Sequence, residues 1–146
     1  EFRYAAGGIL ALVHDTLIVI GAVALMNMEF TINILAVLVF VIGFSINDTI
    51  VTLDRIREIV KRNPKQKLED IINSAINETL SRTILTSLTV FFTVLALYIF
   101  GGAVIRDFAF ALLIGTVIGT YSTIYIACTS VLFFEKLQLS RMQRKE

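Results

Sequence analysis

Residues 43–49 read Gly-Phe-Ser-Ile-Asn-Asp-Thr and lie within a strongly apolar run that extends from Phe30 to Leu53. Asp48 is the only charged residue of that run. A helix of this length crosses the ~30 Å of hydrocarbon in a bilayer. An ionised carboxylate at that depth costs roughly 2.5–3.5 kcal/mol on insertion scales, and a membrane helix keeps it only when it is paired, hydrated or protonated. The stretch therefore predicts a membrane protein that handles protons or ions.

Four apolar runs of this kind follow one another along the 146 residues, of which 56% are hydrophobic. The mean hydropathy of +0.80 exceeds that of soluble domains, and a chain of this size cannot bury so much apolar surface in one core. The sequence therefore predicts an all-α, polytopic membrane helix bundle, with residues 1–146 forming a single transmembrane domain. The expected spans are about 5–26, 31–54, 83–100 and 104–134. The fourth run is long enough to tilt or to project beyond the membrane.

Lys and Arg are unevenly distributed, although the net charge is only +1. Arg3 precedes the first span, seven basic residues lie in the loop 55–82, and four lie in the tail 135–146. Arg106 alone lies between the last two spans. The positive-inside rule then places the loop and both ends of the chain in the cytoplasm. Acidic residues alternate with the basic ones in the loop, which favours a solvated, orientation-setting segment over nucleic-acid binding.

Apolar residues recur with helical spacing from Leu68 to Leu80, which predicts a cytoplasmic amphipathic helix. Asn63 and Pro64 are expected to open this helix, because both residue types are favoured at helix starts. Its apolar face should lie at the membrane surface or against the cytoplasmic ends of the spans. Arg82 follows at the start of the third span, where it either snorkels to the headgroups or has a functional role.

Further polar side chains accompany Asp48 at membrane depth. His14 and Asp15 occupy the middle of the first span, and adjacent helix positions point about 100° apart, so they are not expected to share one metal ion. Either hydrogen bonds to neighbouring helices or proton traffic would account for them. Asp48 itself is either an interhelical hydrogen-bond anchor or a proton carrier. The supporting polar positions are His14, Asp15, Ser45, Asn47 and Thr49.

Other patterns point to packing rather than to covalent chemistry. Gly115 and Gly119 have the small-xxx-small spacing of a close helix-packing face. The single Cys128 lies inside the last span and is expected to be a packing residue. The sequence has no glycine-rich phosphate loop, paired-cysteine metal site or nucleophile elbow. We therefore expect no enzymatic activity, no organic cofactor and no metal ion.

Several ordered stretches, with matching gaps, cover nearly the whole chain: Ala11–Asp15, Gly43–Thr49, Asp54–Glu58, Thr79–Thr83 with Thr86–Ser87, Phe100–Gly102, Arg106–Phe108 and Gly119–Ser122. Together they resemble the SecF family of protein-export membrane subunits, which work with SecD and belong to the resistance–nodulation–division superfamily. The resemblance implies that the chain holds spans three to six of a six-span protein. The part before them would carry an extracytoplasmic domain that engages the preprotein.

The resemblance also implies a function and its partners. The family uses the proton gradient to promote protein translocation through the Sec translocon, and its motifs assign proton coupling to Asp48 and Arg82. The implied partners are SecD, separate or fused, the Sec translocon channel, the translocating preprotein and membrane lipid. The implied location is the cytoplasmic membrane of a bacterium or archaeon. The alternatives are a non-transporting scaffold subunit of the translocon and a small-molecule/proton antiporter of the same superfamily.

Overall fold

A computed structural model describes residues 2–143 of the chain, with side chains for residues 4–137. Its elements are α1 (Phe2–Leu25), α2 (Ile32–Arg62), α3 (Leu68–Phe100), α4 (Gly102–Ser122), the π-helical turn η1 (Thr123–Ala127) and α5 (Cys128–Gln143). The described part of the chain contains no strand, and the predicted all-α class is confirmed. Residues 144–146 of the predicted tail lie outside the described residues.

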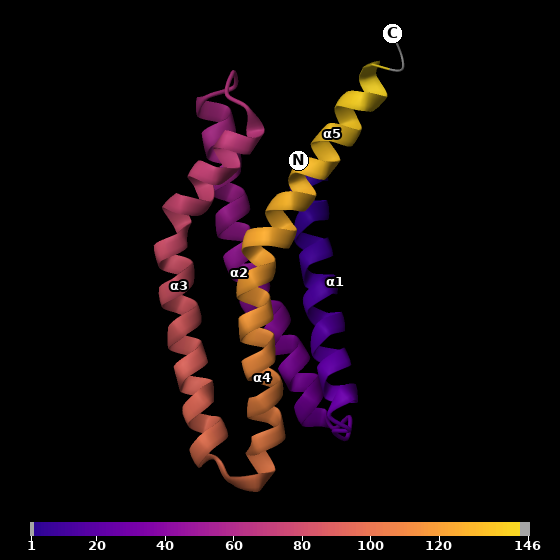
Figure 1. Ribbon diagram of the computed structural model, residues 1–146, viewed down its shortest axis with the longest axis vertical. Coiled ribbons are helices and arrows are strands. Elements are labelled where there is room, and N and C mark those ends of the chain that lie inside the picture. The colour runs from indigo at the N-terminus through magenta and orange to yellow at the C-terminus, as the bar shows by residue number, and fades with distance from the viewer. Residues whose placement is uncertain (1, 144–146) are drawn as a thin grey trace.

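Four helical segments are long and apolar enough to cross a membrane: Tyr4–Leu25, Ile32–Arg62, Leu68–Phe100 and Gly102–Leu137. The predicted polytopic membrane bundle is therefore confirmed. The last segment runs through α4, η1 and α5 without a break. Its path turns aside between α4 and α5 (Figure 1), where the π-helical turn interrupts the regular α-helical hydrogen bonding.

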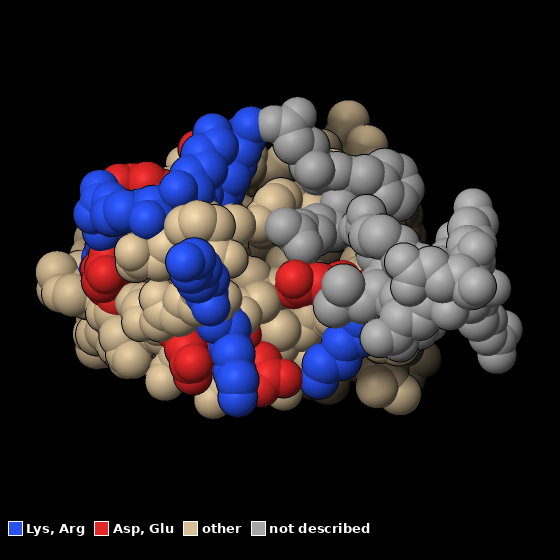
Figure 2. All heavy atoms as spheres, turned by 90° about the horizontal axis from the view of Figure 1, so that it is seen from above, with Lys and Arg blue, Asp and Glu red and all other residues tan. Residues whose placement is uncertain are grey.

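The helices form an elongated bundle with two chemically different ends (Figure 1). We call the end with the turn 63–67 the charged end, because Lys and Arg side chains gather there with acidic residues between them (Figure 2). The turns 26–31 and 101 lie at the opposite end, whereas the beginning of α1 and the end of α5 lie toward the charged end (Figure 1). Helix α4 is central, since it contacts α1, α2 and α3.

The predicted amphipathic helix and the third span form one continuous helix, α3. No glycine or proline interrupts residues 68–100, so helical hydrogen bonding continues through the change from an amphipathic to an apolar sequence. Asn63 does not open this helix, contrary to the expectation. It ends α2, and its backbone N–H donates to the Ile59 carbonyl. The turn through Pro64 then delivers the chain to Leu68, where α3 begins.

The buried apolar residues form two clusters along the bundle. One joins α1, α2, α3 and α4 toward the opposite end, and its buried members are Val19, Val23, Ile34, Val37, Leu38, Val41, Val94, Ala109, Ala111 and Leu112. The other lies toward the charged end and consists of Leu53, Ile56, Ile59, Ile71, Ile72, Ala75, Cys128 and Val131. The apolar face of residues 68–80 therefore packs against α2 and α5, which was one of the two predicted positions.

Gly115 and Gly119 face α2 from α4, and Gly115 sets the spacing between the two helices. A side-chain carbon placed on Gly115 would collide with the Val41 side chain, and one on Gly119 would lie 3.5 Å from Ser45 Cβ. The distance at Gly119 is an ordinary van der Waals contact, so it is Gly115 that must lack a side chain for the two backbones to approach this closely. This contact holds α2 in the register in which Ser45 faces α1 and Asp48 faces α3.

Candidate functional site

Asp48 lies on α2 at the contact with α3. The Thr83 hydroxyl donates a hydrogen bond of 2.8 Å to Asp48 Oδ1. The other carboxylate oxygen, Oδ2, is buried and has no hydrogen-bond partner among the described residues. A buried acceptor without a partner costs free energy, more so when it is charged. The carboxyl group is thus half satisfied, and a proton, a water molecule or a movement of the helices would complete it.

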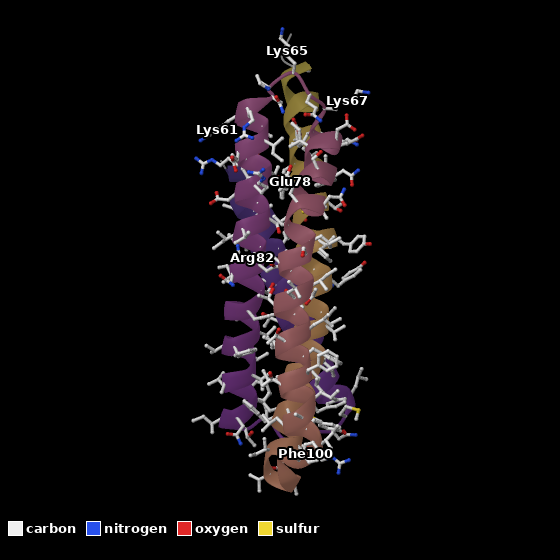
Figure 3. The ribbon with its side chains drawn as sticks, turned by 90° about the vertical axis from the view of Figure 1, so that its left-hand side faces the viewer. Lys61, Lys65, Lys67, Glu78, Arg82 and Phe100 are labelled. Carbon is white, nitrogen blue, oxygen red and sulfur yellow. The ribbon has the colours of Figure 1, made fainter. Side chains whose placement is uncertain are left out.

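Arg82 precedes Thr83 on α3, yet its side chain is exposed and forms no ion pair with any described residue. Its positive charge nevertheless acts on Asp48 through space. Figure 3 shows Arg82 well below Lys61, Lys65 and Lys67 at the charged end, and far above Phe100 at the opposite end. At 1.5 Å per residue, Arg82 lies about 27 Å along α3 from Phe100. A hydrocarbon layer ~30 Å thick that begins at Phe100 would thus end close to Arg82.

A second polar contact joins α1 to α2. The Asp15 side chain is fully buried, and its Oδ2 accepts a hydrogen bond of 2.6 Å from the Ser45 hydroxyl. Asp15 Oδ1 lies 3.0 Å from His14 Nδ1, and 29% of the His14 side chain is exposed. The structure thus brings three of the predicted supporting residues together, with Asp15 at their centre.

Hydroxyl groups continue this polar region into the fourth span. Thr49 Oγ1 and Thr123 Oγ1 lie 3.2 Å apart, which connects α2 to η1. The Ser122 hydroxyl lies 3.5 Å from the Ala11 carbonyl oxygen of α1. We call Asp15, Ser45, Asp48, Thr49, Thr83 and Thr123 the polar seam. It crosses the bundle from α1 through α2 to α3 and η1.

Two predicted supporting residues lie outside the seam: His14, which borders it at Asp15, and Asn47. Asn47 is exposed on α2, because it points away from the contacts that its neighbours Asp48 and Ser45 make. Sequence reasoning missed Thr83 and Thr123, which are the partners of Asp48 and Thr49. Their only sequence signal is that each hydroxyl residue interrupts an apolar helix, a property shared by many threonines of this chain.

Ion pairs outside the seam gather at the charged end. Arg55 of α2 pairs with Glu58 on its own helix and with Glu78 on α3. Arg62 also pairs with Glu58, at 2.9 Å. These groups are exposed, and such pairs contribute little to stability. Among the residues described, no three His, Cys, Asp or Glu side chains gather in a way that would hold a metal ion.

The fold and the seam define a class: a multi-pass membrane helix bundle with ionisable groups buried between its helices. The profile of the family described as "Protein export membrane protein SecD/SecF, C-terminal" matches residues 1–137. The chain belongs to this family, and it represents the C-terminal part of SecF-type proteins.

Two relatives illustrate the match. A protein translocase subunit SecF from Calditerrivibrio nitroreducens is 54% identical over 140 residues, which are 94% of this chain and 46% of that protein. A SecF subunit from Vibrio alginolyticus is 48% identical over 127 residues, which are 87% of this chain and 40% of that protein. The chain thus spans less than half the length of these relatives.

Solved structures agree in fold. SecDF in its super-membrane-facing form superposes on all of this chain with a TM-score of 0.94 and 40% identity, although the match covers only 20% of that protein. A second SecDF structure, of a translocon-associated membrane protein from a Thermus species, gives a TM-score of 0.88 and 43% identity. That match covers 93% of this chain and 19% of the other.

Proposed function

We propose that this chain is the part of a SecF subunit that uses the proton gradient to promote protein translocation across the cytoplasmic membrane. The observation that carries the proposal is the half-satisfied carboxyl of Asp48. One of its oxygens is held by Thr83 across a helix contact, and the other is buried without a partner among the described residues. An ionisable residue in a membrane span is a candidate functional site by default.

The proposed mechanism is a protonation switch between α2 and α3. In the ionised state, the Asp48 carboxylate accepts the Thr83 hydroxyl and attracts the charge of Arg82. A proton arriving from the extracytoplasmic side neutralises the carboxylate and gives Oδ2 a hydrogen to donate. The attraction to Arg82 is lost, and the contact between α2 and α3 rearranges. Release of the proton to the cytoplasm restores the first state.

The orientation follows from the charged end, which we place in the cytoplasm. Asp48 lies about 24 Å along α2 from Ile32 at 1.5 Å per residue, so its proton would leave by the shorter, cytoplasmic path. Movement would be passed to extracytoplasmic parts of the protein, which draw the preprotein outward. This is vectorial transport without covalent catalysis, and it calls for no metal ion or organic cofactor.

We further propose that the partners are SecD, fused or separate, the Sec translocon channel and the preprotein. The support is the match to SecDF structures, one of which is of a translocon-associated membrane protein. Membrane lipid or partner helices would cover the apolar side chains that face outward, such as Leu17, Val39 and Phe92. The competing function is a non-transporting scaffold, in which the Thr83–Asp48 hydrogen bond only anchors two helices.

The test is export of a signal-bearing preprotein by cells that carry the full-length protein with Asp48→Asn. Export is measured with the proton gradient intact and then collapsed, at matched protein levels. Asp54→Asn is the control, because Asp54 is an exposed aspartate of the same helix. We expect Asp48→Asn to lose the stimulation by the gradient and Asp54→Asn to keep it. If Asp48→Asn keeps it as well, the scaffold function is favoured.

A further inference from the structure

Asp15 is the most deeply buried charged side chain of the described chain, with 0% of its surface exposed. It lies about 15 Å along α1 from Leu25 at 1.5 Å per residue, which is the middle of a hydrocarbon layer ~30 Å thick. Its two oxygens have different partners: Ser45 donates to Oδ2 at 2.6 Å, and His14 Nδ1 lies 3.0 Å from Oδ1. This carboxyl group takes no part in the contact between Asp48 and Thr83.

The helices packed around Asp15 offer little charge to balance it. On α1 the only ionisable neighbour is His14. On α2 the neighbour is the neutral Ser45, and the next ionisable group is Asp48, one turn further along. On α4 the residue beside Ser45 is Gly119, and residues 108–120 contain no ionisable side chain. At η1 and the start of α5, Thr123 and Cys128 are buried, and Cys128 lies against the Thr123 carbonyl.

A permanently ionised carboxylate in these surroundings would be costly. A proton held by this pair of side chains, on the carboxyl or on the imidazole beside it, would remove that cost. The imidazole suits the second role, because histidine is the side chain whose charge most readily changes near neutral pH. Since 29% of the His14 side chain is exposed, His14 connects the buried carboxyl to the face of the bundle that lipid or partner helices would cover, and a proton would reach it along a polar path between those helices.

We propose that Asp15 and His14 form a second proton-binding site, one step before Asp48 on the extracytoplasmic side. The binding of a proton at Asp15 does not depend on the proposed function, whereas the transfer of that proton to Asp48 rests on it. The imidazole of His14 takes up the proton and passes it to the Asp15 carboxylate, which becomes neutral. In the structure the Ser45 hydroxyl donates to Asp15 Oδ2, so this hydroxyl must first rotate away. The protonated Asp15 carboxyl then donates to Ser45 Oγ, and Ser45 passes its own proton on as it receives the incoming one.

The step from Ser45 to Asp48 is short. These residues are three apart on α2, and side chains with that spacing are neighbours on a helix surface, with ≈ 5–6 Å between their Cβ atoms. A single water molecule spans such a gap. Asp48 Oδ2 is the free acceptor at the receiving end, since no described residue donates to it. The seam thus supplies a donor, a relay hydroxyl and an open acceptor in the order that inward proton movement requires.

The test is infrared difference spectroscopy of the full-length protein with its partner subunit, in lipid, over a pH titration. A buried carboxyl group shows its own C=O stretching band when it is protonated. We expect Asp15→Asn to remove one titrating band and Asp48→Asn to remove another, while Asp54→Asn removes neither. His14→Gln keeps the Asp15 carboxyl, and it should shift the pH at which the Asp15 band titrates, which a purely structural histidine would not do.

The outcomes separate the two proposals. If the band lost in Asp48→Asn titrates and no band depends on Asp15, the second site does not exist and the proposed function stands. If the Asp15 band titrates and Asp48 shows none, the second site stands and the proposed function fails. If His14→Gln leaves the Asp15 titration unchanged, His14 is not part of the site. His14→Gln retains the buried carboxyl, so it tests the inference even if Asp15→Asn does not accumulate.

Discussion

The Thr83 hydroxyl donates to Asp48 Oδ1 across 2.8 Å, and this is the contact through which the intramembrane carboxyl of α2 reaches α3. It places Asp48 beside Thr83 rather than in an ion pair with Arg82, the residue that the family resemblance assigns to proton coupling together with Asp48. The electrostatic effect of Arg82 is therefore exerted at a distance. Substitution of Thr83 should therefore alter the pH dependence of gradient-driven export, whereas removal of the Arg82 charge should abolish gradient-dependent export.

Thr83→Val should weaken the coupling of export to the proton gradient while keeping the shape of the side chain. The substitution leaves Asp48 without its hydroxyl donor, and a hydrogen bond to a charged group contributes about 1.5–3 kcal/mol. We expect the pH dependence of gradient-driven export to shift, measured in membrane vesicles over a pH series. Thr89→Val is the matched control, because the exposed Thr89 hydroxyl bonds only to the Leu85 carbonyl of its own helix. Identical pH profiles for both variants would exclude a role for Thr83.

Arg82→Ala should abolish gradient-dependent export, and Arg82→Lys should retain part of it. Lysine keeps the positive charge but lacks the planar, five-donor guanidinium, and Arg82 forms no ion pair with the described side chains that would require that geometry. The measurement is preprotein export with and without the gradient. Lys65→Ala, in the exposed turn at the charged end, is the control for loss of a surface charge. An Arg82→Ala variant as active as the wild type would reduce Arg82 to a headgroup anchor.

Gly115→Ala should destabilise the bundle, because the added methyl group collides with Val41. Overpacking of this kind costs typically 1–3 kcal/mol. Thermal unfolding of the purified full-length protein would show the loss, and Gly21→Ala is the control because nothing lies within 4 Å of its added carbon. The double variant with Val41→Ala should recover part of the stability. If Gly115→Ala is no less stable than Gly21→Ala, the close approach of α2 and α4 is wrong.

Ile71→Ala should destabilise the charged end, because Ile71 is 2% exposed and belongs to the cluster that joins α2, α3 and α5. Removal of a buried isoleucine side chain typically costs 2–5 kcal/mol. Unfolding of the purified protein in detergent measures the effect. Ile99→Ala is the control, since 61% of Ile99 is exposed. Equal, small effects for both would mean that the apolar face of residues 68–80 lies on the membrane surface instead.

The sequence was sufficient to predict four long apolar helices, with the lone carboxyl of Asp48 inside the second of them, because long apolar runs and a single charged residue are local features. The continuity of α3 was not predicted, because the residue composition changes from amphipathic to apolar along it. The helix itself continues across that change. The partner of Asp48 could not be predicted either. Residues 79–93 hold five threonines of similar local sequence, and the register of α3 against α2 decides which one meets the carboxyl. That register depends on tertiary packing, including the contact at Gly115.

The central claim is that Asp48 carries the proton, and proton flux into proteoliposomes tests it most directly. The full-length protein with its partner subunit is reconstituted, a pH gradient is imposed, and a pH-sensitive dye inside the vesicles reports proton entry. The account predicts that Asp48→Asn abolishes the flux while the control Asp54→Asn leaves it unchanged. Flux through Asp48→Asn at the wild-type rate would contradict the account and leave Asp48 as a hydrogen-bond anchor between α2 and α3.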